Sequence, residues 1–126
     1  MAKTQENEIA NAMNAEKDIQ FIKVRDENGN VYTLQFNRRI SEAMEREGFV
    51  FDMDNKPQIT IRTLFRGAFR MNHKGMMPEK IDAIWDAQRG KDKLIAFLYR
   101  LYLKPLEDLM KEPDDNGDEN PTWETF

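Results

Sequence analysis

The sequence lacks most of the side chains on which enzymes depend. Its 126 residues include no cysteine, one histidine and one serine. The missing cysteines exclude disulfide bonds and thiolate metal sites, and a single histidine excludes a histidine pair at metal-ligand spacing. No glycine-rich phosphate-binding loop is present. A nucleophile and its base would have to be Ser41 and His73, and no surrounding residue supports that pair. We therefore expect no enzyme activity, no catalytic residue, no metal site and no cofactor.

Long hydrophobic runs are also missing. The longest, Leu94 to Tyr99, is far shorter than the roughly 20 apolar residues of a membrane span. Residues 1–18 lack the apolar stretch of a secretion signal. These absences predict a cytoplasmic protein that makes no membrane contact.

Negative charge is concentrated at one end of the chain. The net charge is −4, and residues 113–126 contain five acidic residues and no basic one, so the rest of the chain carries a net charge of +1. A nearly neutral body has no general attraction for nucleic acid. The composition predicts a flexible or weakly helical arm over 1–18, one globular domain over 19–112, and a disordered acidic tail over 113–126.

The globular part begins with a predicted β-hairpin over residues 20–36. Ile22 and Val24 alternate with charged residues, and Tyr32, Leu34 and Phe36 alternate with polar ones. The Asn-Gly pair between these two runs, residues 28 and 29, is the typical signal of a tight two-residue hairpin turn. A lone hairpin is marginal in water, so helices are expected to cover its apolar face.

Four helices follow in the prediction, over residues of about 38–47, 57–72, 78–89 and 91–111. Asn37 is expected to cap the first helix, and Gly48 to end it in the left-handed conformation. Pro57 and Pro78 suit the first turns of the second and third, and Gly90 is expected to stop the third. The fold class is therefore α+β, mainly α, with the hairpin packed on a bundle of about four helices.

The second helix carries a basic face made of Arg62, Arg66 and Arg70, opposite an apolar face that includes Leu64, Phe65 and Phe69. Arginines four residues apart are typical of a solvated helix surface. A stripe that binds a partner protein and a phosphate-binding surface are the alternatives. No aromatic stacking platform accompanies the arginines, which argues against nucleic acid.

The fourth helix is unusually apolar. Leucine, isoleucine and aromatic residues occupy most of its circumference, and only a narrow polar stripe remains. Such a helix is either central to its own domain or covered by another chain. Pro105 lies inside it and is expected to kink it near Tyr102 or to divide it in two.

Two segments together resemble a known family of short proteins. They are VYTLQFNRRISEAMEREGF and ITIRTLFRGAFRMNHKGMMPEKIDAIWD, and the likeness covers roughly residues 20–110. The family is that of tail assembly chaperones, encoded in the tail modules of siphophages and of prophages of Gram-positive bacteria. The matching positions are Tyr32, Leu34, Phe36, Met44, Glu45, Gly48, Phe49, Lys56, Pro57, Leu64, Phe65, Gly67, Ala68, Phe69 and His73.

The resemblance implies a role without catalysis. Such chaperones bind the long helical tape measure protein, keep it soluble and help to recruit tail tube subunits. They act in the host cytoplasm and are not expected in the mature virion, and in many phages a frameshift yields a longer form. The tape measure protein and the tail tube protein are therefore the expected partners, and a homo-oligomer stays open.

The apolar surface supplies the candidate partner-binding residues. They are Leu64, Phe65, Phe69, Tyr99, Tyr102, Leu103, Leu106 and Met110, with Trp123 in the tail. Two other functions are alternatives to the chaperone. One is a structural virion protein, such as a head–tail connector or tail component. The other is a small DNA-binding phage regulator that uses Arg38, Arg39, Arg62, Arg66 and Arg70.

Overall fold

The computed structural model describes residues 19–113 and 121–126. The predicted arm over 1–18 and most of the predicted tail lie outside these residues. Within them, two strands and four helices follow one another in the order β1 (Ile22–Arg25), β2 (Val31–Leu34), α2 (Arg38–Arg46), α3 (Pro57–Ala68), α4 (Pro78–Asp86) and α5 (Lys91–Met110). The fold class is α+β and mainly α, as the sequence predicts.

The hairpin forms with the predicted faces. Its strands are antiparallel, with Val24 opposite Tyr32 and Ile22 opposite Leu34. Val24, Tyr32 and Leu34 are buried against the helices. The alternating pattern therefore identified the core face of both strands correctly.

The turn of the hairpin is wider than the predicted two-residue turn. The backbone of Asp26 bonds that of Asn30, which leaves a three-residue loop with Gly29 in the left-handed conformation at φ 83°. One carboxylate oxygen of Asp26 accepts the N–H groups of Asn28 and Asn30, each at 2.9 Å. The Asp26 carboxylate thus binds two backbone N–H groups of the longer loop. In this loop only Gly29 takes a positive φ, whereas a two-residue turn of the Asn-Gly type needs a positive φ at both residues.

The ends of α2 match the prediction. The Asn37 side chain accepts the N–H of Ile40 at 2.8 Å. At the other end Gly48 takes φ 92°, its N–H bonds Glu45, and the N–H of Phe49 bonds Met44 at 2.9 Å. These two bonds are the pair that closes a helix through a left-handed glycine.

Two helices are shorter than predicted. Helix α3 ends at Ala68 rather than near 72, because Phe69 and Arg70 bond the carbonyls three residues back and redirect the chain. Helix α4 ends at Asp86 rather than near 89, where the N–H of Gln88 bonds Trp85 in the same tightened way. Gly90 does not stop α4; at φ 69° it begins α5.

Helix α5 is one helix from Lys91 to Met110, so Pro105 does not divide it. Ser41 on α2 is buried beside it and donates its hydroxyl to the carbonyl of Tyr102 at 3.4 Å, in the turn that precedes the proline. Proline disturbs the hydrogen bonds of that turn. The Ser41 hydroxyl therefore connects α2 to α5 in the turn that precedes the proline.

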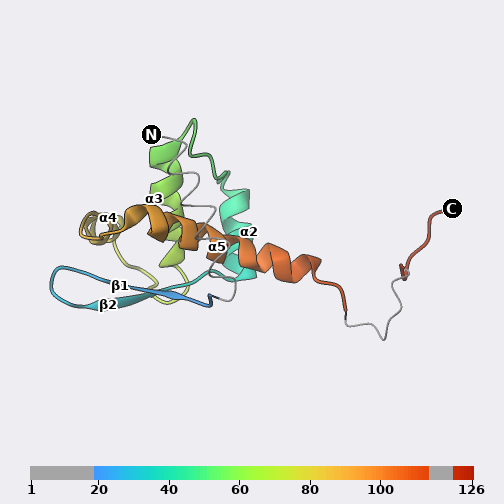
Figure 1. Ribbon diagram of the computed structural model, residues 1–126, viewed down its shortest axis with the longest axis horizontal. Helices are drawn as coiled ribbons and strands as arrows, with labels where there is room; N and C mark the ends of the chain where they lie inside the picture. Colours follow the sequence, from blue (N-terminus) through green and yellow to red (C-terminus); the bar gives the residue numbers. More distant parts are fainter. Residues whose placement is uncertain (1–18, 114–120) are drawn as a thin grey trace.

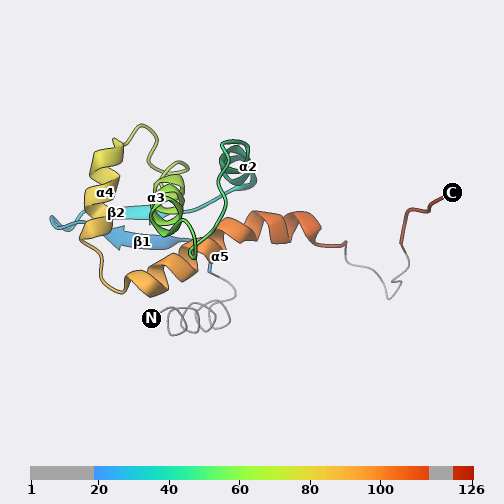
Figure 2. The same ribbon diagram turned by 90° about the horizontal axis from the view of Figure 1, so that it is seen from above.

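The core lies where the helices meet the hairpin. Its largest fully buried side chains are Leu34, Met44, Leu64, Phe65, Phe69 and Leu98, which come from the hairpin, α2, α3 and α5. Gly67 allows α2 and α3 to approach closely, because a Cβ at that position would lie 2.6 Å from the sulfur of Met44. Helix α3 stands with its C-terminal end at the hairpin, and α5 continues past α2 and projects from the body (Figures 1 and 2). None of the helices in the described part of the chain is long and apolar enough to cross a membrane.

Candidate partner-binding surface

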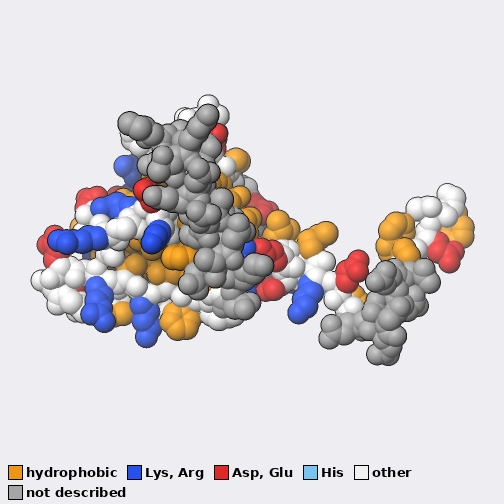
Figure 3. Space-filling model, viewed as in Figure 1, with side chains coloured by type: hydrophobic (Ala, Val, Ile, Leu, Met, Phe, Trp, Pro, Cys, Tyr) orange, Lys and Arg blue, Asp and Glu red, His pale blue; other side chains and the backbone are white. Residues whose placement is uncertain are grey.

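Helix α5 changes character at Pro105. Before the proline, Leu98, Leu101 and Tyr102 are buried. After it, Leu106 is 51% exposed, Leu109 55% and Met110 72%. This exposed stretch lies on the end of α5 that projects from the body, where hydrophobic side chains stand among charged ones (Figure 3). The apolar excess that the sequence predicts for this helix is therefore confined to its last turns.

A groove runs between this end of α5 and helix α2. Its α5 side consists of Tyr102, Leu103, Pro105, Leu106 and Leu109, and its α2 side of Arg38, Ser41, Glu42 and Glu45. Ser41 and Glu42 lie three and four residues after Arg38, and Glu45 lies four and three residues after them, so the four positions share one helix face. The cavity in the groove measures about 140 Å³. We call it the α2–α5 groove.

The phenol of Tyr102 shows how apolar and acidic groups meet in this groove. The ring packs edge-on against Phe36 and Phe49, with centroids 5.4 and 5.2 Å away. Burial raises the pKa of the Tyr102 phenol above its ordinary value, and the negative charge of Glu45 raises it further. The carboxylate of Glu45 and the ring of Tyr102 therefore both border the α2–α5 groove.

Several predicted partner-binding residues are core residues instead. Leu64, Phe65 and Phe69 are 0, 1 and 0% exposed. They belong to the hydrophobic core, so the structure places these three candidates inside the domain and not on its exposed apolar surface. The reason is that α3 packs against α4 and α5 on this face.

The candidates on α5 divide along the helix. Tyr102 is buried, and Leu103 is half-buried in the groove wall. Tyr99 is half-buried and stacks on Phe51 with ring centroids 3.7 Å apart. Leu106 and Met110 are exposed, as is Trp123 near the C-terminus. The candidate list missed Leu109, although its spacing from Leu106 by three residues already places the two on one face.

The arginines of α3 bind other elements of the same chain. The Arg66 guanidinium donates two hydrogen bonds to the carboxylate of Asp82 on α4. Arg70 donates two to Glu47, which follows α2, at 2.7 and 3.1 Å. These arginines lower the pKa of both carboxyl groups below their ordinary values. Arg66 and Arg70 therefore connect helices, and Arg62 is the exposed member of the basic face.

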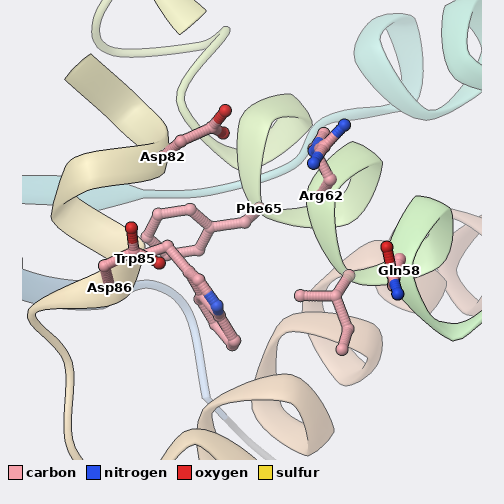
Figure 4. Close-up of a pocket in the computed structure, with 7 residues that line it drawn as sticks. Gln58, Arg62, Phe65, Asp82, Trp85 and Asp86 are labelled. Carbon is pink, nitrogen blue, oxygen red and sulfur yellow. The ribbon is translucent and has the colours of Figure 1, made fainter. Parts of the chain in front are cut away.

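A second hollow, of about 430 Å³, opens between α3 and α4 (Figure 4). Its lining mixes the rings of Phe65 and Trp85 with the charged groups of Arg62, Asp82 and Asp86. Asp82 is already bound to Arg66. Among residues 19–113 and 121–126, no cluster of acidic and histidine side chains has the arrangement needed to hold a metal ion.

Ser41 and His73 serve separate parts of the fold. Ser41 contacts α5, as described above, whereas His73 lies at the outer edge of β2. The Nε2 atom of His73 accepts the N–H of Thr33 at 3.0 Å, and its ring packs on Tyr32 and Phe69. The structure does not bring this serine and histidine together.

The comparisons with known proteins identify one family. Residues 1–125 match the family described as a domain of unknown function, DUF5055. No curated protein and no solved structure matches the chain.

Proposed function

We propose that this chain, which belongs to the DUF5055 family, is a non-enzymatic phage tail assembly chaperone that binds the tape measure protein and helps to recruit tail tube subunits. The observation that carries the proposal is the exposed apolar end of α5. Leu106, Leu109 and Met110 lie on successive turns of a helix that leaves the body of the domain. Exposed clusters of apolar side chains are typical of surfaces that bind another protein.

The shape of the surface supports a helical partner. An amphipathic helix binds by placing leucine-like side chains, three or four residues apart, in a groove between helices. The α2–α5 groove and the projecting turns of α5 form one continuous surface of this kind, because Leu106 and Leu109 belong to both. Tape measure proteins are long and helical, and they need a cover for their apolar surface until the tail forms.

Co-expression tests the proposal. We expect that a tape measure protein encoded beside this chain becomes soluble when the two are produced together, and that both elute as one complex. The matched control is the same tape measure protein co-expressed with the chain carrying Leu106→Ser and Leu109→Ser. A partner that stays insoluble with the unaltered chain would contradict the chaperone role.

The two alternatives make different predictions. A structural virion protein would be found by peptide mapping of purified particles, whereas a chaperone acts in the host cytoplasm and is absent from them. A DNA-binding regulator needs free cations, and two arginines of the basic face are bound to carboxylates. DNA binding predicts steeply salt-dependent retention on duplex DNA, and we expect none.

A further inference from the structure

The tip of the hairpin exposes two neighbouring residues that can react with each other. Asn28 and Gly29 are both exposed in the three-residue loop between β1 and β2. Within the described part of the chain, the side-chain amide of Asn28 is bound to no other group. Glycine has no Cβ, so its backbone nitrogen is less shielded than that of other residues. An asparagine followed by glycine is therefore the pair in which the backbone most easily attacks the side chain.

The reaction is an intramolecular deamidation. The backbone nitrogen of Gly29 loses its proton and bonds to Cγ of Asn28, while the bond between Cγ and Nδ2 breaks. The Nδ2 amino group takes up the proton and leaves as ammonia, and a cyclic imide remains. Water then opens the ring at either carbonyl, which gives aspartate or isoaspartate. No group is oxidised or reduced, and solvent water is the co-reactant.

The folded loop restrains the nitrogen that must attack. The N–H of Gly29 donates to the carbonyl of Asp26 at 3.1 Å, so the proton that has to leave is hydrogen-bonded. The Asp26 carboxylate also accepts the N–H groups of Asn28 and Asn30 at 2.9 Å, and the Asn30 side chain and the Tyr32 hydroxyl at 3.0 Å. These hydrogen bonds, chiefly that from the Asn30 side chain, hold the pKa of the Asp26 carboxyl below its ordinary value. The acceptor is thus charged at neutral pH, which strengthens its bonds.

We propose that Asn28 is a site of spontaneous deamidation and that the Asp26 carboxylate delays the reaction by anchoring the loop. The Gly29 nitrogen reaches Cγ of Asn28 only after it has left the Asp26 carbonyl and the loop has opened. Exposed loops open locally much more often than the whole domain unfolds. The rate in the folded protein therefore depends on the fraction of molecules in which the loop is open, and that fraction depends on Asp26.

Deamidation changes both the charge and the backbone of the hairpin. An aspartate at this position places a new negative charge beside those of Asp26 and Glu27. Isoaspartate in addition carries the main chain through its side-chain carbon, which lengthens the connection between β1 and β2. Both products disturb the loop bonds that hold Val24 opposite Tyr32. The Asp26 anchor thus protects the pairing of the strands.

Peptide mapping of the full chain tests the inference. The protein is kept in mildly alkaline buffer, either folded or unfolded in guanidinium chloride, and mass spectrometry follows the conversion at Asn28. We expect the folded protein to react about tenfold or more slowly than the unfolded chain, and folded Asp26→Ala to react about tenfold faster than the folded wild type. Asn116 and Gly117, which lie outside the described residues, are the same pair and provide an internal reference within each sample.

Two further variants make the result specific to the anchor. Asp26→Asn keeps an oxygen acceptor without the charge, so we expect a rate between those of the wild type and Asp26→Ala. Glu27→Gln is the matched control, because Glu27 is exposed beside Asp26 and makes none of the bonds that anchor the loop. Its rate should equal that of the wild type. Circular dichroism shows whether each variant keeps its helices.

Three results would overturn the inference. They are equal rates at Asn28 in the folded and the unfolded wild type, no acceleration by Asp26→Ala, and the same acceleration by Glu27→Gln as by Asp26→Ala. If Asp26→Ala loses its helices, the folded Asp26→Asn variant decides. A rate at Asn28 above that of the wild type then supports the anchor, and an unchanged rate overturns it.

Discussion

At the scale of single residues, the only histidine has a structural contact that its sequence context did not indicate. His73 and Asn72 follow α3 and bind the free edge of β2. The N–H of Thr33 donates to His73, and the Asn72 side chain donates to the Thr33 carbonyl at 3.2 Å. Gln35 further along donates its N–H to the carbonyl of Ala68. Exposed strand edges attract other chains, so these contacts protect the edge.

The Arg66–Asp82 pair makes a prediction about pH. Its side chains are 36% and 39% exposed, so solvent screening keeps its contribution near 1 kcal/mol. We expect Asp82→Asn to lower the free energy of unfolding by about that amount at neutral pH. Hydrogen bonding to Arg66 lowers the pKa of Asp82 in the folded state, so the contribution is present above the ordinary value of about 3.8.

The contribution should disappear as the pH falls through the lowered pKa. Urea titrations of the wild type and of Asp82→Asn at neutral and strongly acidic pH measure this, and the two curves should converge in acid. Asp86→Asn is the matched control, because Asp86 lies one turn further along α4 without an ion pair among the described residues. A difference between wild type and Asp82→Asn that is independent of pH would contradict the assignment.

At the scale of elements, short side chains and glycines set where helices end and how closely they pack. Asn37 and Gly48 close the two ends of α2 by local hydrogen bonds. Thr60, which is fully buried on α3, accepts the N–H of Asp52 at 3.1 Å and so fixes the loop between α2 and α3. Gly67 then lets α2 and α3 meet at the side chain of Met44.

The left-handed end of α2 can be tested with two substitutions. Gly48→Ala places a Cβ on a residue with φ 92°, and we expect it to lower the free energy of unfolding by about 1–2 kcal/mol. No heavy atom lies within 4 Å of the added Cβ, so the cost comes from the backbone rather than from a clash. Gly48→Asn should lose less, because asparagine tolerates this conformation better. Equal losses in chemical denaturation would rule out the conformational explanation.

At the scale of the whole molecule, the domain is complete before the last turns of α5. Leu98 is fully buried and belongs to the core, whereas Leu106 and Leu109 are more than half exposed. The first part of the helix packs on α3 and α2, whereas its last turns are covered only in part, by α2 across the α2–α5 groove.

This division predicts that substitutions in the two parts of α5 have different effects on stability. Leu98→Ala is expected to lower the free energy of unfolding by about 2–5 kcal/mol, because it leaves a cavity in the core. Leu106→Ser with Leu109→Ser should change it by less than about 1 kcal/mol, as is usual for surface sites. Thermal unfolding of the three proteins measures both. A large loss of stability in the double variant would show that these leucines belong to the core.

The sequence determined the local features of this protein. Alternation gave the faces of both strands, Asn37 and Gly48 marked the ends of α2, and the order of the elements followed from periodicity. The three-residue turn and the early ends of α3 and α4 were not predicted, because they depend on side-chain hydrogen bonds such as that of Asp26 and on tightened last turns.

Only the tertiary structure decided which apolar and basic residues are available to a partner. A helix pattern shows that Phe65 and Leu106 are apolar, but burial depends on what lies opposite each one. Phe69 and Trp85 pack on Phe65 inside the core, whereas Leu106 is half exposed beside the α2–α5 groove. In the same way, Arg66 and Arg70 looked like a free basic face until Asp82 and Glu47, distant in sequence, proved to be their partners. Contacts between distant segments carry no periodic signal in the chain.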